Sequence, residues 1–216
     1  MDIIVCKTFD QTTKEAIKLL KERLLFNNKH VFIVPDSFTL NLERYIMESL
    51  SLTSTFNIEV TTFKRLQSKL GDSSKISLSK AGLVMLLGKL ADEEFFGASA
   101  KRKGFAEKMY ETIAQLKSSD VPPEKLEIMP SEELLKLKIN GIKKIYYLYR
   151  SEMQKKNFTD AGDKYEDLIS AIKTCNYFSD KNVYLLQFNN YTPQMMKIIK
   201  ILAETALSLT IGTVEG

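Results

Sequence analysis

Short apolar runs alternate with segments of helical periodicity in the first part of the chain, and this alternation constrains the fold most strongly. The apolar runs occur at residues 2–6, 31–34 and 58–61. Each is followed by a segment whose hydrophobic side chains recur every three to four residues, the spacing of an amphipathic helix. Strands that alternate with such helices form βαβ units, so a parallel sheet covered by helices on both faces is predicted.

The first two helices can be bounded from their apolar faces. One is expected over residues 11–28 and the next from about Ser37 onward. The stretch VFIVPDSFTLNLER, residues 31–44, therefore combines a strand end with a helix start, and Pro35 and Asp36 are expected to shape the turn between them.

The pattern changes in the middle of the chain. Between about Ser77 and Phe178 only helical periodicity is present, and strand character returns at residues 182–188 and 207–214. An all-helical insertion in an α/β domain is therefore predicted. The expected boundaries are 1–75 plus 180–216 for the α/β domain and 76–179 for the insertion.

The last predicted strand bears on the length of the polypeptide. Residues 207–214 have the composition of a strand in the middle of a sheet. A doubly wound sheet rarely ends without a helix that covers such a strand. The chain is therefore expected to be the front part of a longer polypeptide.

Composition excludes several classes of protein. The two cysteines, Cys6 and Cys175, are far apart, and His30 is the single histidine, so neither a zinc site nor a histidine-based triad is expected. No apolar run approaches the ~18 residues of a membrane span. The N-terminus has no basic region or hydrophobic segment typical of a secretory signal, which favours a reduced, cytoplasmic protein. A net charge of +4 permits nucleic-acid binding without requiring it.

The first loop, CKTFDQTTKEA, lacks the residues of a phosphate-binding loop. Such a loop needs glycines, because its backbone N–H groups must curl round a phosphate, and a lysine that reaches the terminal phosphates. Lys7 or Lys14 supplies a charge and Thr13 a hydroxyl, but the first glycine in the chain is Gly71.

Nucleotide hydrolysis also requires a carboxylate that holds Mg²⁺ at the end of a buried strand. The candidate strand ends in Leu186, Gln187 and Phe188, none of which is acidic. Two independent requirements therefore fail together. The sequence predicts no ATPase activity and no cofactor in this chain.

Two clusters have both a functional and a structural interpretation. The four acids Asp160, Asp163, Glu166 and Asp167 suggest a metal site, but acids in the first turns of a helix also cap it and oppose its dipole. Capping is favoured over metal binding.

The second cluster consists of Tyr146, Tyr147 and Tyr149, whose rings are able to stack on bases. However, Tyr149 shares a helical spacing with Ile145 and Met153, which favours packing in a core. The basic run at residues 101–103 has two interpretations as well, a solvated loop or a set of phosphate contacts.

Five short motifs occur in an order that resembles the N-terminal region of AddB (RexB), a subunit of bacterial AddAB-type helicase–nucleases. The family's VPxxFTxxxE stretch is matched by Val34, Pro35, Phe38, Thr39 and Glu43, and its [ST]FxRL stretch by Thr62, Phe63, Arg65 and Leu66. In the predicted insertion, the GFA stretch is matched by Gly104, Phe105 and Ala106, and the KL…IYxxY stretch by Lys136, Leu137, Ile145, Tyr146 and Tyr149. The DGFxxFTPQ-like stretch is matched by Phe188, Tyr191, Thr192, Pro193 and Gln194. The resemblance covers nearly the whole chain. It implies a parallel-sheet, P-loop-NTPase-like (helicase-like) domain interrupted by the helical insertion.

The chain departs from the family at its nucleotide site. Many members have a glycine-rich P-loop near the N-terminus, whose positions correspond here to Cys6, Gln11 and Thr12, with only Thr13 keeping the pattern. The Asp-Gly before the family's Phe is replaced by Leu186 and Gln187, and the downstream nuclease domain and iron–sulfur cysteines are not represented. The resemblance thus implies a motor-like fold without motor chemistry.

In such complexes this subunit holds DNA, as a single strand or duplex end, and the partner AddA subunit supplies ATP-driven movement. The resemblance therefore implies a heterodimer that acts in double-strand break repair by homologous recombination. An alternative from a different class is a scaffold that docks the motor subunit and contacts DNA little.

The expected DNA contacts lie at strand ends, where loops of helicase-like folds face nucleic acid. Phe63 is a candidate for base stacking and Arg65 for a phosphate or base edge. The alternatives are that Phe63 begins a core face, that Arg65 is solvated, and that Ser37 or Thr39 only caps a helix. The full set of candidates is Ser37, Thr39, Phe63, Lys64, Arg65, Tyr191 and Thr192, with Lys101, Arg102 and Lys103 as candidate phosphate contacts.

Overall fold

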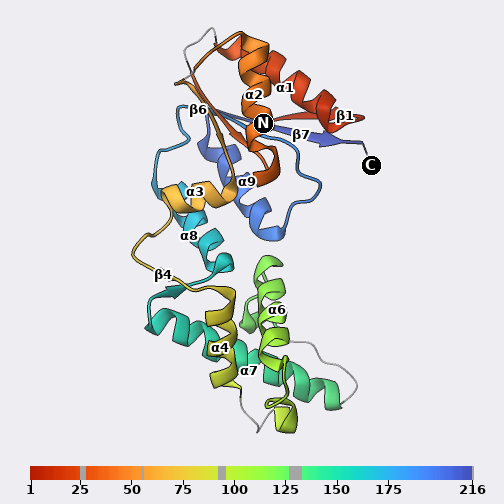
Figure 1. Cartoon of the computed structure of the whole chain (residues 1–216), viewed down its shortest axis with the longest axis vertical. Coiled ribbons are helices and arrows are strands. Elements are labelled where there is room, and N and C mark those ends of the chain that lie inside the picture. The colour runs from red at the N-terminus through yellow and green to blue at the C-terminus, as the bar shows by residue number, and fades with distance from the viewer. Residues whose placement is uncertain (25–27, 55, 92–95, 127–132, 216) are drawn as a thin grey trace. The chain divides into compact units, whose positions relative to one another are not determined.

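The computed structural model describes residues 1–24, 28–54, 56–91, 96–126 and 133–215. The chain divides into two compact units (Figure 1). The first, which we call the sheet unit, comprises residues 1–71, 166–191 and 195–216. The second, the helical unit, comprises residues 72–165 and 192–194. The predicted boundaries at 75/76 and 179/180 stay predictions.

The sheet unit contains five strands and the helices that connect them. Its elements are β1 (Asp2–Cys6), α1 (Phe9–Leu24), β2 (Lys29–Ile33), the 3-10 helix η1 (Asp36–Phe38), α2 (Thr39–Leu50), β3 (Ile58–Thr61), α3 (Phe63–Leu70), the greater part of α8 (Ala161–Thr174), β6 (Lys181–Leu185), α9 (Pro193–Thr205) and β7 (Ser208–Val214). The strands are ordered β1-β7-β6-β2-β3, and all neighbouring pairs are parallel. The predicted α/β class with a parallel sheet is thus confirmed, and β7 lies inside the sheet as expected.

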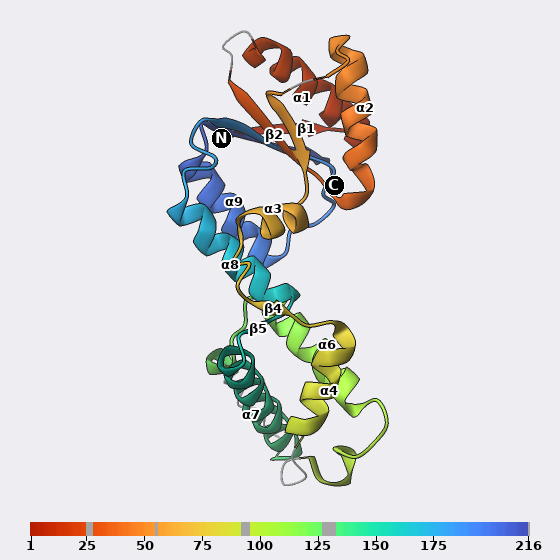
Figure 2. The same ribbon diagram turned by 60° about the vertical axis from the view of Figure 1, so that its left-hand side comes forward.

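Helices lie on both faces of the sheet, as the near-continuous apolar strands predicted, although Ile3 and Val5 of the edge strand β1 are exposed (Figure 2). On one face Phe32 and Tyr184 stack with their ring centroids 4.4 Å apart, and α1 and α2 pack over them. The alternate side chains, such as Ile33 and Leu185, are fully buried on the other face, where α3 and α9 lie. Leu66 of α3 is likewise fully buried.

Two predicted boundaries differ from the structure for local reasons. The first helix ends at Leu24 rather than at residue 28, and residues 25–27 lie outside the described residues. The strand predicted over 182–188 ends at Leu185. Gln187 adopts a left-handed φ of 69°, which turns the backbone out of the extended conformation and stops the strand early.

The helical unit is built mainly from α4 (Lys80–Leu90), α6 (Phe105–Ser118) and α7 (Glu133–Lys155), with the 3-10 helices η2 (Gly97–Ser99) and η3 (Pro123–Lys125). Its core includes Tyr146 and Tyr149, so core packing is confirmed for both, whereas Tyr147 is exposed.

The expectation of helices alone between about Ser77 and Phe178 was wrong in one respect. The two-residue strands β4 (Ile76–Ser77) and β5 (Phe158–Thr159) form a parallel pair. Strands of two residues are too short to show the period-two alternation by which strands are found in a sequence. Across the described ranges, no helix has both the length and the apolar character that a membrane crossing requires.

Candidate nucleic-acid interface

The carboxyl ends of the five strands lie at one edge of the sheet because all neighbouring strands are parallel. The segments that leave this edge begin at Lys7, Val34, Thr62, Leu186 and Glu215. Loops at this edge are where open α/β sheets bind ligands. Most of the predicted contact residues belong to these segments.

The turn after β2 places one predicted contact on the surface and buries another. The N–H of Phe38 donates to the carbonyl of Pro35 at 2.9 Å and closes η1. Ser37 is exposed, whereas Thr39 is 7% exposed and its hydroxyl donates to the carbonyl of Asp36 at 3.1 Å. Ser37 is therefore accessible to a ligand, while Thr39 serves the local turn.

The turn after β3 starts α3 with a side-chain cap. The hydroxyl of Thr62 accepts a hydrogen bond from the N–H of Arg65 at 3.2 Å, as an N-cap residue does. Phe63 is 4% exposed, and its ring lies 5.6 Å from the ring of Phe188. This burial favours the core-packing alternative for Phe63 over base stacking.

The first turn of α3 also carries two exposed cations, Lys64 and Arg65. Together with Asp36, Ser68 and Lys69 they line a surface hollow within the sheet unit. Among the described residues, neither Lys64 nor Arg65 forms an ion pair. Two cationic side chains are thus available to an anion at the carboxyl edge of the sheet.

Phe188 and Tyr191 continue this edge after β6. Their ring centroids lie 5.4 Å apart, and the hydroxyl of Tyr191 is buried without a hydrogen-bond partner in the described structure. Burial raises the pKa of Tyr191 to about 12, so this hydroxyl stays protonated at neutral pH. Thr192 is exposed and belongs to the helical unit, as do the exposed Lys101, Arg102 and Lys103.

The first loop is occupied by its own hydrogen bonds. The N–H of Gln11 donates to the hydroxyl of Thr8 at 3.3 Å, and the N–H of Thr12 donates to the carbonyl of Thr8 at 3.1 Å. The N–H of Lys7 in turn donates to the side-chain carbonyl of Gln11 at 3.2 Å. These backbone donors are therefore committed within the loop and are not directed at a phosphate.

The residues predicted to form a degenerate nucleotide site are also contacted from the end of β6. The amide of Gln187 donates to the hydroxyl of Thr13 at 2.8 Å and to the carbonyl of Phe9 at 3.2 Å. Below this contact, a Cβ on Gly212 of β7 would lie 2.7 Å from Leu186 and 3.2 Å from Thr12. A larger residue would force these side chains to shift. Ile4 of β1 lies opposite Gly212, while Cys6, at the end of β1, is half-buried and lies opposite Val214.

Two members of the acidic cluster, Asp160 and Asp163, cap the start of α8, as the sequence predicted. A carboxylate oxygen of Asp160 accepts from the N–H of Asp163 at 2.9 Å, and that of Asp163 accepts from the N–H of Asp160 at 3.3 Å. The ammonium of Lys117 lies 2.6 Å from both carboxylates, and the hydroxyl of Tyr149 donates to Asp160 at 2.5 Å. In the part of the chain that the structure describes, no group of His, Cys, Asp or Glu is arranged to hold a metal ion.

His30 is a structural residue. It is 1% exposed, and its Nδ1 lies 3.4 Å from the hydroxyl of Tyr184. Burial, and then the nearby guanidinium of Arg23, lower its pKa to about 4. The imidazole is therefore neutral at pH 7.

The sequence did not identify Ser68 and Lys69 as neighbours of Arg65, or Asp36 as part of the same hollow. The spacing of Arg65 and Lys69 is i, i+4, which places both on one face of a helix and was a usable signal. Asp36 joins them because β2 and β3 are neighbours in the sheet, and strand order was not predicted.

Comparison with known proteins identifies relatives of this chain. A model of the family described as "ADDB, N-terminal" matches residues 9–214. The ATP-dependent helicase/deoxyribonuclease subunits B of Alkaliphilus oremlandii (strain OhILAs) and Alkaliphilus metalliredigens (strain QYMF) are 30% and 28% identical, each over 91% of this chain and 18% of their own length. That of Clostridium novyi (strain NT) is 29% identical over 86% of the chain and 17% of its own length. The chain thus spans less than a fifth of the curated relatives that it matches.

Proposed function

Because the chain belongs to the family described as "ADDB, N-terminal", we propose that it is the helicase-like, DNA-binding region of an AddB-type subunit and does not hydrolyse nucleotides itself. Its role is to hold a DNA strand during double-strand break repair by homologous recombination. An AddA-type partner supplies the ATP-driven movement. In this proposal the chain binds DNA without a cofactor.

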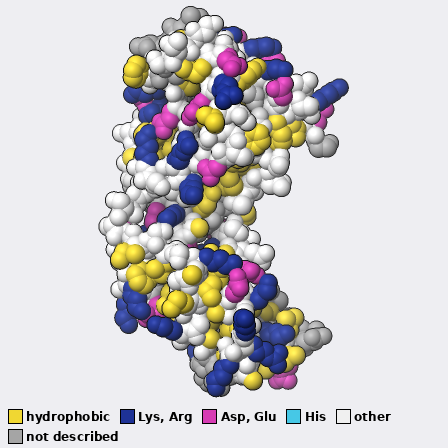
Figure 3. All heavy atoms as spheres, viewed as in Figure 1, with side chains coloured by type: hydrophobic (Ala, Val, Ile, Leu, Met, Phe, Trp, Pro, Cys, Tyr) yellow, Lys and Arg dark blue, Asp and Glu magenta, His cyan; other side chains and the backbone are white. Residues whose placement is uncertain are grey.

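One observation carries the DNA-binding proposal. Lys64 and Arg65 are exposed on the first turn of α3, line one hollow with Lys69, and have no ion-pair partner among the described residues. Unpaired cations at a strand-end edge suit phosphate contacts, which supply most of the sequence-independent affinity for nucleic acid. Figure 3 shows one face of the molecule, on which basic and acidic side chains are interspersed. Net charge alone therefore does not mark the site.

The first loop supports the absence of nucleotide chemistry. Its backbone donors bond within the loop, and Gln187 occupies the hydroxyl of Thr13. No acidic side chain stands among residues 186–188, where Mg²⁺ would need a ligand. Purified chain is expected to show no ATP hydrolysis above a blank, and measurable turnover that survives repurification would overturn this part of the proposal.

The DNA-binding proposal is tested by fluorescence anisotropy with a labelled oligothymidylate across a salt series. Arg65→Ala is expected to weaken binding by about three- to ten-fold at low salt and to flatten the log–log salt dependence by about 0.7, the value for one phosphate contact on a single strand. Lys21→Ala is the matched control, because Lys21 is an exposed cation in the last turn of α1, away from the carboxyl edge.

Two results would contradict DNA binding. One is the absence of binding by the unmodified chain at low salt. The other is an equal loss of affinity in Arg65→Ala and Lys21→Ala, which would make the interaction a general effect of charge.

A specific observation also favours the scaffold alternative. β1 is an edge strand, and its side chains Ile3 and Val5 are 58% and 54% exposed. Exposed apolar groups side by side mark protein-docking surfaces more often than nucleic-acid contacts. If Ile3→Ser/Val5→Ser leaves DNA binding intact but abolishes association with an AddA-type subunit, docking is a second function of the same unit.

A further inference from the structure

We propose that Glu59 and Tyr177 bind the Lys69 ammonium and so keep it from contacting nucleic acid. Of the three cations that line the hollow on α3, only Lys64 and Arg65 are then available to a phosphate. The inference rests on the proposed function, since it concerns the strength of the same DNA-binding surface. It identifies the Glu59 carboxylate on β3 and the Tyr177 hydroxyl, in the turn before β6, as the groups that limit the DNA affinity of this surface.

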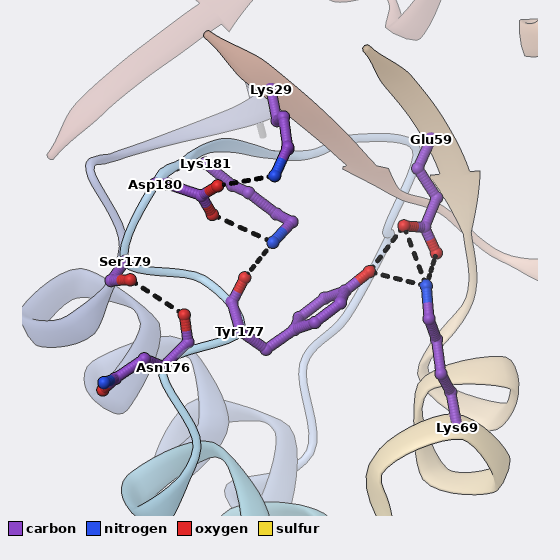
Figure 4. Close-up of polar contacts among 8 residues, drawn as sticks. All are labelled: Lys29, Glu59, Lys69, Asn176, Tyr177, Ser179, Asp180 and Lys181. Atoms are coloured by element: carbon purple, nitrogen blue, oxygen red, sulfur yellow. Dashed lines mark hydrogen bonds and ion pairs between the residues drawn. The ribbon is translucent and has the colours of Figure 1, made fainter. Parts of the chain in front are cut away.

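The surroundings of Lys69 use its whole hydrogen-bonding capacity (Figure 4). Its ammonium donates to the two carboxylate oxygens of Glu59 at 2.9 and 3.1 Å and to the hydroxyl of Tyr177 at 2.7 Å. An ammonium group has three N–H donors and no acceptor. Three acceptors therefore already occupy it, and a phosphate has to displace one of them.

The two acceptors also bind each other, which fixes them around the lysine. The hydroxyl of Tyr177 donates to Glu59 at 2.5 Å. Burial raises the pKa of Glu59, but the Tyr177 hydroxyl and the Lys69 ammonium outweigh it and hold that pKa below the ordinary value. Glu59 is therefore ionised at neutral pH and cancels the charge of Lys69.

Tyr177 is itself anchored beside the first residue of β6. Its carbonyl accepts a hydrogen bond from the ammonium of Lys181, which lies 3.9 Å from the Tyr177 ring centroid. The carboxylate of Asp180 contacts Lys181 at 3.0 Å and Lys29 of β2 at 2.8 Å. The ring of Phe178, which is 1% exposed, meets the Tyr177 ring edge-on. We call Glu59 and Tyr177 the clamp on Lys69. Glu59 lies on β3, and Tyr177 is held by contacts that reach β6 and β2.

Lys69 and the two available cations, Lys64 and Arg65, all lie on the short helix α3. Arg65 precedes Lys69 by four residues, and both line the hollow. The difference between them is their partners and not their exposure, because the Lys69 side chain is 49% exposed. Loss of the Glu59 charge frees the Lys69 ammonium, which is already exposed, to act as a third phosphate contact.

The first experiment is the salt dependence of oligothymidylate binding by the 216-residue chain. Glu59→Gln is expected to bind about two- to five-fold more tightly at low salt, with a log–log slope steeper by about 0.7. The double variant Glu59→Gln/Lys69→Gln has the same net charge as the unmodified chain and is expected to match its affinity and slope. A double variant with a weaker affinity and a flatter slope than the unmodified chain would show that Lys69 already contacts the DNA.

The second experiment needs no DNA and separates this inference from the proposed function. Acetic anhydride modifies uncharged, accessible amines, and the hydrogen bonds of Lys69 to Tyr177 and Glu59 raise its pKa despite the opposing effect of burial. Acetylation of Lys69, followed by mass spectrometry, is expected to be several-fold slower than that of Lys64. Glu59→Gln and the charge-neutral Tyr177→Phe are each expected to speed it up.

The outcomes distinguish the two proposals. If the unmodified chain fails to bind oligothymidylate while Lys69 is protected, the proposed function fails and the clamp stands. If DNA binds but Lys69 reacts as fast as Lys64 in every variant, the clamp is refuted.

Discussion

The two units use a basic side chain in opposite ways. In the helical unit Lys117 is 9% exposed, lies 2.6 Å from two carboxylates and stands 5.2 Å from the ring centroid of Tyr149. In the sheet unit Arg65 is exposed and has no ion-pair partner among the described residues. One cation is committed to holding α6 against the start of α8, and the other is free to bind an anion.

This difference shows that surroundings, and not residue type, decide what a charge does. The Lys117 ammonium counteracts the effect of burial on Asp160 and keeps its pKa below the ordinary value. Arg65 is solvated and forms no ion pair among the described residues, so its charge contributes little to folding. The first site is expected to govern the stability of the chain and the second its binding.

The largest expected effect is that of Lys117→Met. Removal of the ammonium leaves Asp160, which is 5% exposed, buried without its counter-charge. Loss of one partner of a buried ion pair costs about 3–5 kcal/mol of unfolding free energy, which urea denaturation measures.

Lys80→Met is the matched control for that substitution. Lys80 pairs with Glu107 at 2.8 Å, but both side chains are about half exposed. Its removal is expected to lower the unfolding free energy far less than the removal of Lys117 does, because solvent screens an exposed ion pair. Equal losses in the two variants would mean that the Lys117 pair is solvated and that the contrast between buried and exposed cations does not hold.

His30 provides a third case to compare with Lys117 and Arg65, because it is a buried base without a counter-ion. Its folded pKa of about 4 lies below its ordinary value of 6.5, so the unfolded state binds more protons between these values. Stability is therefore expected to fall as the pH drops through that window, by up to about 2 kcal/mol between pH 7 and pH 5.

The measurement is urea unfolding of the unmodified chain and of His30→Leu at both pH values. The variant should lack this part of the pH dependence. An identical dependence in both proteins would show that His30 is already protonated in the folded state or that other groups control the loss.

The smallest expected effect concerns Asp36, the acid in the α3 hollow. Asp36→Asn removes a negative charge beside Lys64 and Arg65, so oligothymidylate affinity should rise by about two- to three-fold at low salt and less at high salt. Glu22→Gln, which removes an exposed acid from α1, serves as the control. No difference between the two variants would indicate that DNA does not enter the hollow.

Sequence reasoning located the elements better than their contacts. The apolar runs predicted β1, β2 and β3 because each strand carries its apolar residues consecutively, although Ile3 and Val5 of the edge strand β1 are exposed. The positions of Ser37 and Arg65 at strand ends followed in the same way. The burial of Phe63 was only one of two alternatives, since a helical spacing shared with Leu66 says nothing about which ring lies opposite.

The remaining features depend on contacts that are distant in sequence. Tyr177 meets Glu59 across 118 residues, and Gln187 meets Thr13 across 174. No local pattern encodes such pairs. The hollow and the clamp on Lys69 therefore became visible only with the strand order.

The strand order also has a consequence for how the chain folds during synthesis. β1 is hydrogen-bonded to β7 alone, with Asp2 opposite Thr210 and Cys6 opposite Val214. At about 5–20 residues per second, a ribosome needs on the order of ten to forty seconds to make the residues between them. During that interval β2 and β3 can pair with each other, but β1 has no partner in the sheet. β1 therefore has to wait for β7, and until then its apolar side chains are open to chaperones and to other unfolded chains.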